Sequence, residues 1–213
     1  MIWDEINHLK RILKDPVIAQ RKFKDDNKVF WEHKNKKSEL TEFAPNALLR
    51  TVDIKLETND GITLKGDVFD IKMFKHSAGK GSDFIILCHQ GSQKYAIFVD
   101  LKSSITEKSA EQCYINHLTS GDGEYVEQIN GSLSLFDYLA SVIDNFYSCG
   151  ELKGGYQKRC IVLYRRSVPS DKLPYIKLTR PKPKGMNLRK KTVNVLQVPA
   201  TNQIDIAELI AAC

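Results

Sequence analysis

The amino-acid sequence predicts an α/β fold in which helices flank a mixed central sheet. Apolar residues recur at helical spacing near the N-terminus and again between residues 125 and 146. Two uninterrupted apolar runs, FIIL at 84–87 and YAIFV at 95–99, are typical of strands that are buried on both faces. The strand-like segment CIVLYRR follows the second helical stretch. The expected order is therefore helix, strand, strand, strand, helix, strand.

The composition indicates one ordinary globular protein. With 213 residues, of which 42% are hydrophobic and 27% charged, the chain is long enough to bury one α/β core. No run approaches the 18 or so apolar residues of a membrane helix, and MIWDEINHLKRILKD is charged from Asp4 onward, unlike a signal peptide. We therefore expect a cytoplasmic protein with no membrane partner.

The cysteines and histidines argue against two common kinds of site. The five cysteines are odd in number and include no C-x-x-C pair, which disfavours a zinc ribbon and a disulfide framework. The five histidines show no H-x-x-x-H or H-E-x-x-H spacing. Cys88 and His89 are adjacent, so on a strand they would point to opposite faces and would not form a nucleophile and base. Any metal would more naturally be held by carboxylates.

A single domain over 1–213 is expected, with a core at 51–166, an N-terminal helical segment at 1–50 and a basic C-terminal extension at 167–213. The spacing of apolar residues predicts a helix over 2–13, which Asp15-Pro16 ends. Residues 20–39 are dense in charge and read as a surface segment or loop, and a short helix is expected at 39–49.

The pattern changes to alternation at Thr51. The stretches 51–58 and 62–74 read as two strands of a hairpin around Asn59-Asp60-Gly61. The remaining expected elements are strands at 84–90 and 95–104, helices at 105–118 and 124–150, strands at 157–166 and 192–198, and a terminal helix at 203–212.

Positive charge is concentrated late in the chain. Residues 51–150 carry 8 Lys/Arg against 14 Asp/Glu, whereas residues 151–191 carry 13 against 2. Such an excess attracts polyanions such as nucleic acid, although a solvated basic loop would have the same composition. The residues expected to contact a phosphate backbone are Arg165, Arg166, Lys182, Lys184, Arg189, Lys190 and Lys191.

The tripeptide Asp100-Leu101-Lys102 is the strongest candidate for chemistry. An acid two residues before a lysine also occurs at Asp26, Glu32, Asp53, Asp70 and Glu151, so the spacing alone does not distinguish a site from a charged strand end. Its position does, because Asp83 begins the neighbouring strand and residues i and i+2 of a strand share a face. Phosphodiester hydrolysis with a divalent cation needs carboxylate ligands and a positive group near the phosphate.

The run from Asp83 through FIILCHQ, GSQK and YAIFV to Asp100-Leu101-Lys102 resembles the PD-(D/E)xK, or restriction endonuclease-like, nuclease superfamily. This resemblance covers about residues 51–166 and implies an αβββαβ core. It further implies that Asp83, Asp100 and the backbone carbonyl of Leu101 hold Mg²⁺ or Mn²⁺. Lys102 would orient or deprotonate the attacking water or stabilise charge on the phosphate, and Gln128, on the following helix, would steady both.

The sequence departs from the family pattern in three places. Ser82 stands where the first motif has proline, and the second acid is Asp rather than the commoner Glu. An upstream helical Glu, found in many members, has only Glu39 and Glu42 as candidates, which leaves the number of metals open. Gln112 is an alternative to Gln128, which is favoured because its helix carries the longer apolar stripe.

The resemblance implies a Mg²⁺-dependent endonuclease acting on nucleic acid, with DNA the expected substrate. Proteins of this group often serve in bacterial restriction or antiphage defence, so a protein partner in a defence complex is implied, and a homo-oligomer is left open. The alternative is a non-catalytic nucleic-acid-binding or assembly subunit with the same fold. The two hypotheses differ in whether metal-dependent cleavage occurs.

Overall fold

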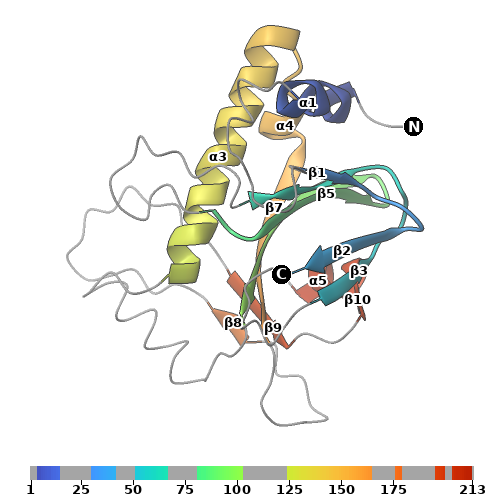
Figure 1. Ribbon diagram of the computed structural model, residues 1–213, viewed down its shortest axis with the longest axis vertical. Coiled ribbons are helices and arrows are strands. Elements are labelled where there is room, and N and C mark those ends of the chain that lie inside the picture. Colours follow the sequence, from blue (N-terminus) through green and yellow to red (C-terminus); the bar gives the residue numbers. More distant parts are fainter. Residues whose placement is uncertain are drawn as a thin grey trace, which may run out of the picture.

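The computed structural model describes residues 4–14, 30–41, 51–66, 81–102, 124–164, 176–178, 195–199 and 203–212, which form a mixed α/β fold with two mixed sheets (Figure 1). The helices are α1 (Asp4–Lys14), α3 (Glu124–Tyr147), α4 (Glu151–Gly154) and α5 (Ile206–Ala212). The strands are β1 (Phe30–Glu32), β2 (Lys37–Thr41), β3 (Thr51–Lys55), β4 (Ile62–Lys65), β5 (Phe84–Gln90), β6 (Gln93–Lys102), β7 (Tyr156–Tyr164), β8 (Ile176–Leu178), β9 (Val195–Pro199) and β10 (Gln203–Asp205).

The larger sheet has seven strands in the order β1-β4-β5-β6-β7-β9-β8. Strands β4, β5 and β6 form an antiparallel series, and β7 lies parallel to β6. A parallel neighbour requires a crossover connection, and α3 provides it between β6 and β7. Strand β9 pairs parallel with β7, and β8 pairs antiparallel with β9 at the edge of the sheet.

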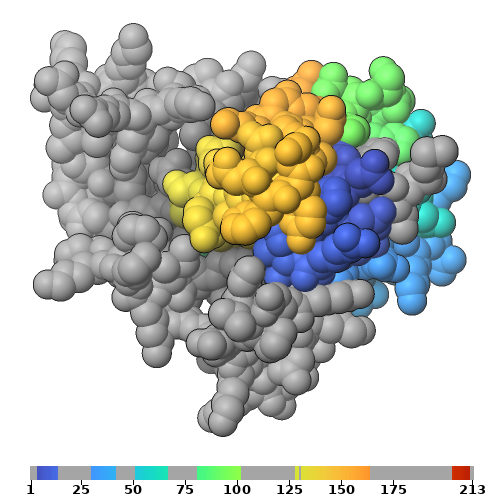
Figure 2. All heavy atoms as spheres, turned by 90° about the horizontal axis from the view of Figure 1, so that it is seen from above, coloured from blue at the N-terminus to red at the C-terminus, as the bar shows by residue number. Residues whose placement is uncertain are grey.

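Helices α1 and α3 cover one face of this sheet. In α1 the apolar residues Ile6, Leu9 and Leu13 recur every three or four positions, so they share one buried face. On α3, Phe136 packs edge-on against Phe98 of β6, with ring centroids 5.7 Å apart. Figure 2 shows the two helices side by side over this face. Together these side chains form the first hydrophobic core.

The opposite face is covered by a three-stranded sheet, β10-β3-β2, together with α5. Val52 and Ile54 of β3 are fully buried between the two sheets, beside Leu209 of α5. Figure 1 shows the resulting three layers of helices, large sheet and small sheet. The large sheet is therefore buried on both faces, as the runs FIIL and YAIFV predict.

The hairpin expected from residues 51–58 and 62–74 is wrong. Strand β3 pairs with β2 and β10 in the small sheet, whereas β4 pairs with β1 and β5 in the large sheet. The chain does turn around Gly61, but the apolar residues of β3 enter the second core and those of β4 the first. Alternation identifies a strand and its buried face without identifying its partner.

Two expectations for the N-terminal segment are also wrong. Residues 30–32 and 37–41, read as part of a charged surface segment, are strands β1 and β2. The helix expected from residue 39 does not begin there, because Glu39 lies in β2 with its side chain 60% exposed. Only two residues of β2, Ser38 and Leu40, are buried, and the charged neighbours of these edge strands mask so short a signal.

Other elements agree with the sequence prediction within a few residues, namely α1, β5, β6, α3, β7 and β9. At the C-terminal end, residues 203–205 form β10 and the helix begins at Ile206. The helix expected over 105–118 and residues 67–74 of the second hairpin strand lie outside the described residues. No helix in the described ranges is long and apolar enough to cross a membrane.

Candidate active site

Asp83 and Asp100 lie opposite each other at one end of the large sheet. The register of β5 with β6 reaches Phe84 opposite Val99, and continuing it by one residue places Asp83 opposite Asp100. Residues opposite each other in an antiparallel pair have Cβ atoms about 5 Å apart. The backbone N–H of Leu101 donates to Asp83 Oδ2 at 2.6 Å, which holds the Asp83 carboxylate against the end of β6.

The backbone of Asp83 is fixed from its other side by β4. The N–H of Gly66 donates to the carbonyl of Asp83 at 2.9 Å. A Cβ at Gly66 would lie 1.9 Å from the carbonyl oxygen of Ser82, so the two backbones approach closely because residue 66 is glycine. Asp83 is thus held between β4 and β6 even though it precedes β5.

Ser132 connects helix α3 to Ser82, the residue before Asp83. Its hydroxyl accepts a 2.6 Å hydrogen bond from the N–H of Ser82 and lies 2.8 Å from the Ser82 hydroxyl. Both serines are fully buried. Gln128 lies four residues before Ser132, so it shares the same face of α3 one turn closer to the helix N-terminus, and it is half-buried. Gln128 therefore lies toward the strand end that carries Asp83 and Asp100.

Asp100 faces the helical layer. Ala96 and Phe98 of β6 belong to the core beneath α3, and strand alternation puts Asp100 on the same face. Its side chain is fully buried. An ionised carboxylate is stable in such a place only with compensating positive charge or hydrogen bonds.

The donor set at this strand end fits a hard divalent cation. Mg²⁺ is commonly held by one or two carboxylates while it keeps several waters, so Asp83 and Asp100 with the carbonyl of Leu101 supply ligands of the right chemistry. Within the described ranges, no group of three or more His, Cys, Asp and Glu side chains is arranged to hold a metal ion. A cation held by these three ligands would keep water or a phosphate oxygen in its remaining coordination positions.

The other expected site residues are placed less completely. Lys102 is the last residue of β6 and pairs with Tyr164 of β7, but its side chain lies outside the described part of the chain. Glu42 and Gln112 also lie outside it, as do all the residues expected to contact phosphate: Arg165, Arg166, Lys182, Lys184, Arg189, Lys190 and Lys191. Glu39 is in the small sheet, in β2, and not on a helix.

Sequence reasoning missed the two serines that join this strand end to the helix. Ser82 and Ser132 are 50 residues apart; Ser82 is recognisable from the sequence only as the residue in place of the family's proline, and Ser132 belongs to no motif. Their only shared signal is that small polar residues interrupt otherwise apolar surroundings, which is common at strand starts. Their pairing becomes visible only when β5 and α3 are in place.

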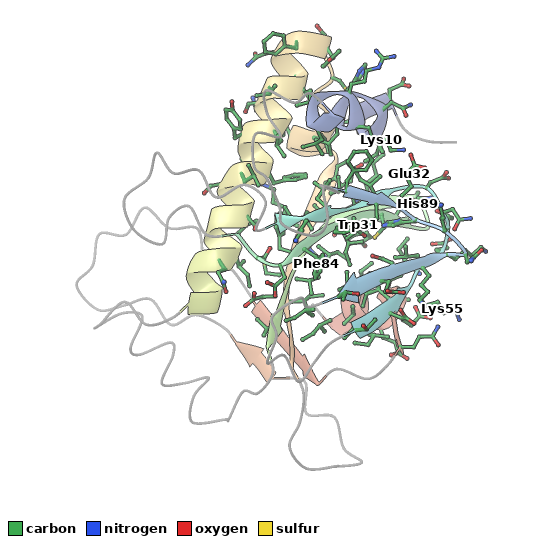
Figure 3. All side chains as sticks on the ribbon, viewed as in Figure 1. Lys10, Trp31, Glu32, Lys55, Phe84 and His89 are labelled. Carbon is green, nitrogen blue, oxygen red and sulfur yellow. The ribbon has the colours of Figure 1, made fainter. Side chains whose placement is uncertain are left out.

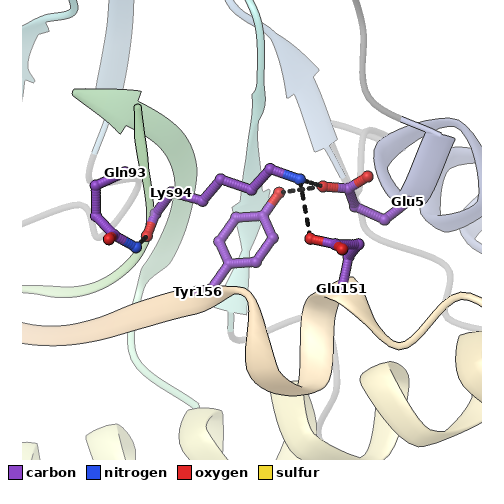
Figure 4. Close-up of polar contacts among 5 residues, drawn as sticks. All are labelled: Glu5, Gln93, Lys94, Glu151 and Tyr156. Carbon is purple, nitrogen blue, oxygen red and sulfur yellow. Dashed lines mark hydrogen bonds and ion pairs between the residues drawn. The ribbon is translucent and has the colours of Figure 1, made fainter. Parts of the chain in front are cut away.

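A second polar cluster lies at the other end of β6 (Figure 4). Lys94 Nζ donates to Glu5 Oε1 at 2.5 Å and to Glu151 Oε2 at 3.2 Å, and the Tyr156 hydroxyl donates to Glu5 at 3.3 Å. Burial acts to lower the pKa of Lys94, but the hydrogen bonds and charges of Glu5 and Glu151 raise it above its ordinary value. Burial, and then the charge of Glu5, raise the pKa of Tyr156. The cluster ties α1 and α4 to the sheet and contains no free nucleophile.

No protein-family model, curated protein or solved structure matches this chain.

Proposed function

We propose that this protein is a metal-dependent nuclease that hydrolyses phosphodiester bonds, with DNA as the expected substrate. The observation that carries the proposal is the placement of Asp83 opposite Asp100 at a strand end to which Ser132 fastens the Gln128-bearing helix. The two carboxylates are the metal ligands that such a reaction requires near the phosphate, and the amide can hold a water beside them.

The order of elements supports the same proposal. When β1, β2, β3 and the short helix α4 are left aside, α1, β4, β5, β6, α3 and β7 come in the order helix, three strands, helix and strand. A restriction endonuclease-like core would have this αβββαβ order, so the order supports the proposal. Strands β1, β2 and β3 are inserted between α1 and β4, and β8, β9 and β10 are added after β7.

Each residue has a definite role in this proposal. Asp83, Asp100 and the Leu101 carbonyl would hold Mg²⁺ or Mn²⁺, which supplies charge stabilisation at the phosphate and a water of lowered pKa. The Leu101 N–H fixes the Asp83 carboxylate in one orientation. Lys102 would stabilise the charge that develops on the phosphate, and Gln128 would hold the attacking water.

One observation favours the alternative of a non-catalytic nucleic-acid-binding or assembly subunit. Asp100 is fully buried, whereas an enzyme needs its metal-binding carboxylate to be accessible to the cation and the substrate. A protein partner that exposes Asp100 would make the buried carboxylate compatible with an enzyme. The protein would then be the effector of a cytoplasmic restriction or antiphage complex. The proposal of an enzyme is preferred because a carboxylate pair is a costly feature for a purely structural strand end.

Cleavage of supercoiled plasmid and of RNA, each with Mg²⁺, Mn²⁺ or EDTA, tests the proposal. Wild-type protein is compared with Asp100→Asn, Lys102→Ala and the control Asp144→Asn. Asp144 is a carboxylate of the same helix as Gln128, partly exposed and far along it, 3.9 Å from Lys153. We expect metal-dependent nicking that falls at least about 100-fold in the first two variants and is unchanged in the control. Equal products from wild type and Lys102→Ala would contradict the catalytic assignment.

A further inference from the structure

A cleft of about 610 Å³ lies on the opposite side of the large sheet from Asp100. It opens between the edge of the large sheet, at β1 and β4, and strand β2 of the small sheet. Its volume is within the range of about 300 to 1,000 Å³ that is usual for small-molecule sites. In Figure 3, Trp31 and Phe84 lie in the space between β5 and β2.

Two aromatic rings form one side of this cleft. Trp31 of β1 and Phe84 of β5 have ring centroids 6.2 Å apart and planes inclined by 56°. Phe84 is buried and Trp31 is partly exposed, so the indole presents ring surface that the second core does not cover. Exposed aromatic surface inside a cleft favours a flat, apolar-faced ligand.

The floor of the cleft is polar and buried. Thr63 Oγ1 lies 2.5 Å from Ser38 Oγ and 3.0 Å from His33 Nε2, and these three residues come from β4, β2 and the turn after β1. All three are at least nine-tenths buried. A hydroxyl has one donor and two acceptor positions. The hydroxyls of Ser38 and Thr63 can therefore form further hydrogen bonds with a ligand that carries both donors and acceptors.

The glycine beside His33 explains how the imidazole fits there. Gly61 has φ +137°, and a Cβ at this position would lie 2.1 Å from the Leu87 carbonyl and 3.1 Å from His33 Nδ1. Burial, with a smaller contribution from the charge of Lys10, lowers the pKa of His33 to about 4. The imidazole is therefore neutral near pH 7, and the floor offers hydrogen bonds without a fixed charge.

The charges around the mouth balance one another. Lys37 Nζ lies 2.6 Å from Asp53 Oδ2 and 4.0 Å from Glu39, and Glu32 accepts a 2.7 Å hydrogen bond from Lys10. A site for a polyphosphate would carry an excess of positive charge, and this cleft does not. The ligand that fits best has an uncharged ring.

We propose that this cleft binds a nucleobase, stacked on the partly exposed ring of Trp31 with its hydrogen-bonding edge toward Thr63 and Ser38. Bases present a flat face for stacking and an edge that carries both donors and acceptors, which matches the wall and the floor. The base can belong to a free nucleoside or to an unpaired nucleotide of a strand. The inference does not rest on the nuclease proposal, because the cleft and the carboxylates lie on different faces of the sheet.

Binding in EDTA tests this inference without any cleavage. The chain has two tryptophans, so the full-length Trp3→Phe protein reports Trp31 fluorescence alone. It is titrated with adenosine, guanosine, cytidine and uridine, and with single- and double-stranded oligonucleotides of about ten nucleotides. We expect saturable quenching by at least one nucleoside or by the single strand. If the single-stranded oligonucleotide binds more tightly than the nucleosides, the ligand is a base within a nucleic-acid strand. If a nucleoside binds equally or more tightly, the ligand is a free nucleoside.

Two substitutions separate binding from folding. Thr63→Val keeps the shape of the floor and removes its hydroxyl, and Trp31→Leu keeps an apolar residue and removes the stacking surface. Each should weaken binding measured by calorimetry about tenfold or more, while Tyr138→Ala, 61% exposed on α3, should leave it unchanged. Far-ultraviolet circular dichroism verifies that each variant is folded. Absence of saturable binding to every ligand, or unchanged affinity in both folded cleft variants, would overturn the inference.

Discussion

Ser82 and Ser132 are joined twice, through the N–H of Ser82 at 2.6 Å and through their hydroxyls at 2.8 Å. They connect the start of β5 with the middle of α3, and Asp83 follows Ser82 directly. The position of Gln128 relative to the carboxylates therefore depends on a contact in which neither partner has a chemical role.

Replacing Ser132 by alanine should be costly in stability and in activity. The variant leaves the buried N–H of Ser82 without its acceptor, which costs about 1 to 3 kcal/mol of unfolding free energy. Urea denaturation measures this loss, and the plasmid assay should show slower nicking because α3 is no longer held in register with β5.

The matched control is Ser141→Ala on the same helix. The Ser141 hydroxyl donates to the Asp137 carbonyl one turn earlier, at an exposed site, so its removal should change stability by less than about 0.5 kcal/mol. If the two variants unfold at the same urea concentration, the Ser82 contact does not hold this end of the sheet.

The two glutamates that share Lys94 should differ in importance. Glu5 is buried and Glu151 has a 57% exposed side chain. Glu5→Ala should cost about 3 kcal/mol, since it removes the buried carboxylate that accepts hydrogen bonds from Lys94 and the Tyr156 hydroxyl. Glu151→Ala should cost less than about 1 kcal/mol, as exposed ion pairs do. Thermal unfolding of both variants beside wild type is the measurement, and equal losses would refute the distinction.

His33 should make the protein less stable in mild acid. Its pKa is 6.5 in the unfolded chain and about 4 in the fold, so between these values the unfolded chain binds a proton that the folded chain does not. Stability should fall as the pH drops from about 6.5 to 4, by about 3 kcal/mol at roughly 1.4 kcal/mol per pKa unit, and no further below that.

The variant His33→Gln removes this contribution. Its unfolding free energy, measured at half-unit steps of pH, should differ from that of wild type by a constant amount above pH 7 and should lack the wild-type decline below it. A decline of the same size in both proteins would assign the acid sensitivity to other groups.

A divalent cation should stabilise the protein through Asp83 and Asp100. A ligand that binds only the folded state adds about 2.7 kcal/mol when its concentration is 100 times its Kd. Calcium, which binds carboxylate and carbonyl oxygens as Mg²⁺ does, should raise the unfolding temperature of wild type and of Asp144→Asn, and should not raise that of Asp100→Asn. Identical shifts in all three proteins would place the bound ion elsewhere.

The sequence predicts the central part of the fold because its signals are local. The runs FIIL and YAIFV and the stripe of α3 each identify an element and its buried face without reference to distant residues. The α/β class follows from their order. Asp83 and Asp100 can be paired in advance because a short turn connects their strands and fixes the register between them.

The parts of the fold that the sequence does not predict depend on contacts between distant segments. Strand β1 is recognisable only beside β4, and the separation of β3 from β4 depends on which of two cores each strand enters. The polar floor formed by His33, Ser38 and Thr63 likewise joins three elements. No spacing rule brings such residues together, because each is a single polar position within an otherwise ordinary strand.

The small sheet has a consequence for the order of folding. Strand β10 pairs with β3 in a register that matches Gln203 with Asp53 and Asp205 with Lys55, so the partners are separated by about 150 residues. Contacts of such long range form slowly because a long loop must close first. During synthesis, β2 and β3 can pair early, but their sheet lacks its third strand until residues 203–205 have left the ribosome. We expect this layer to be the last to complete, and Val52 and Ile54 to remain accessible to chaperones until then.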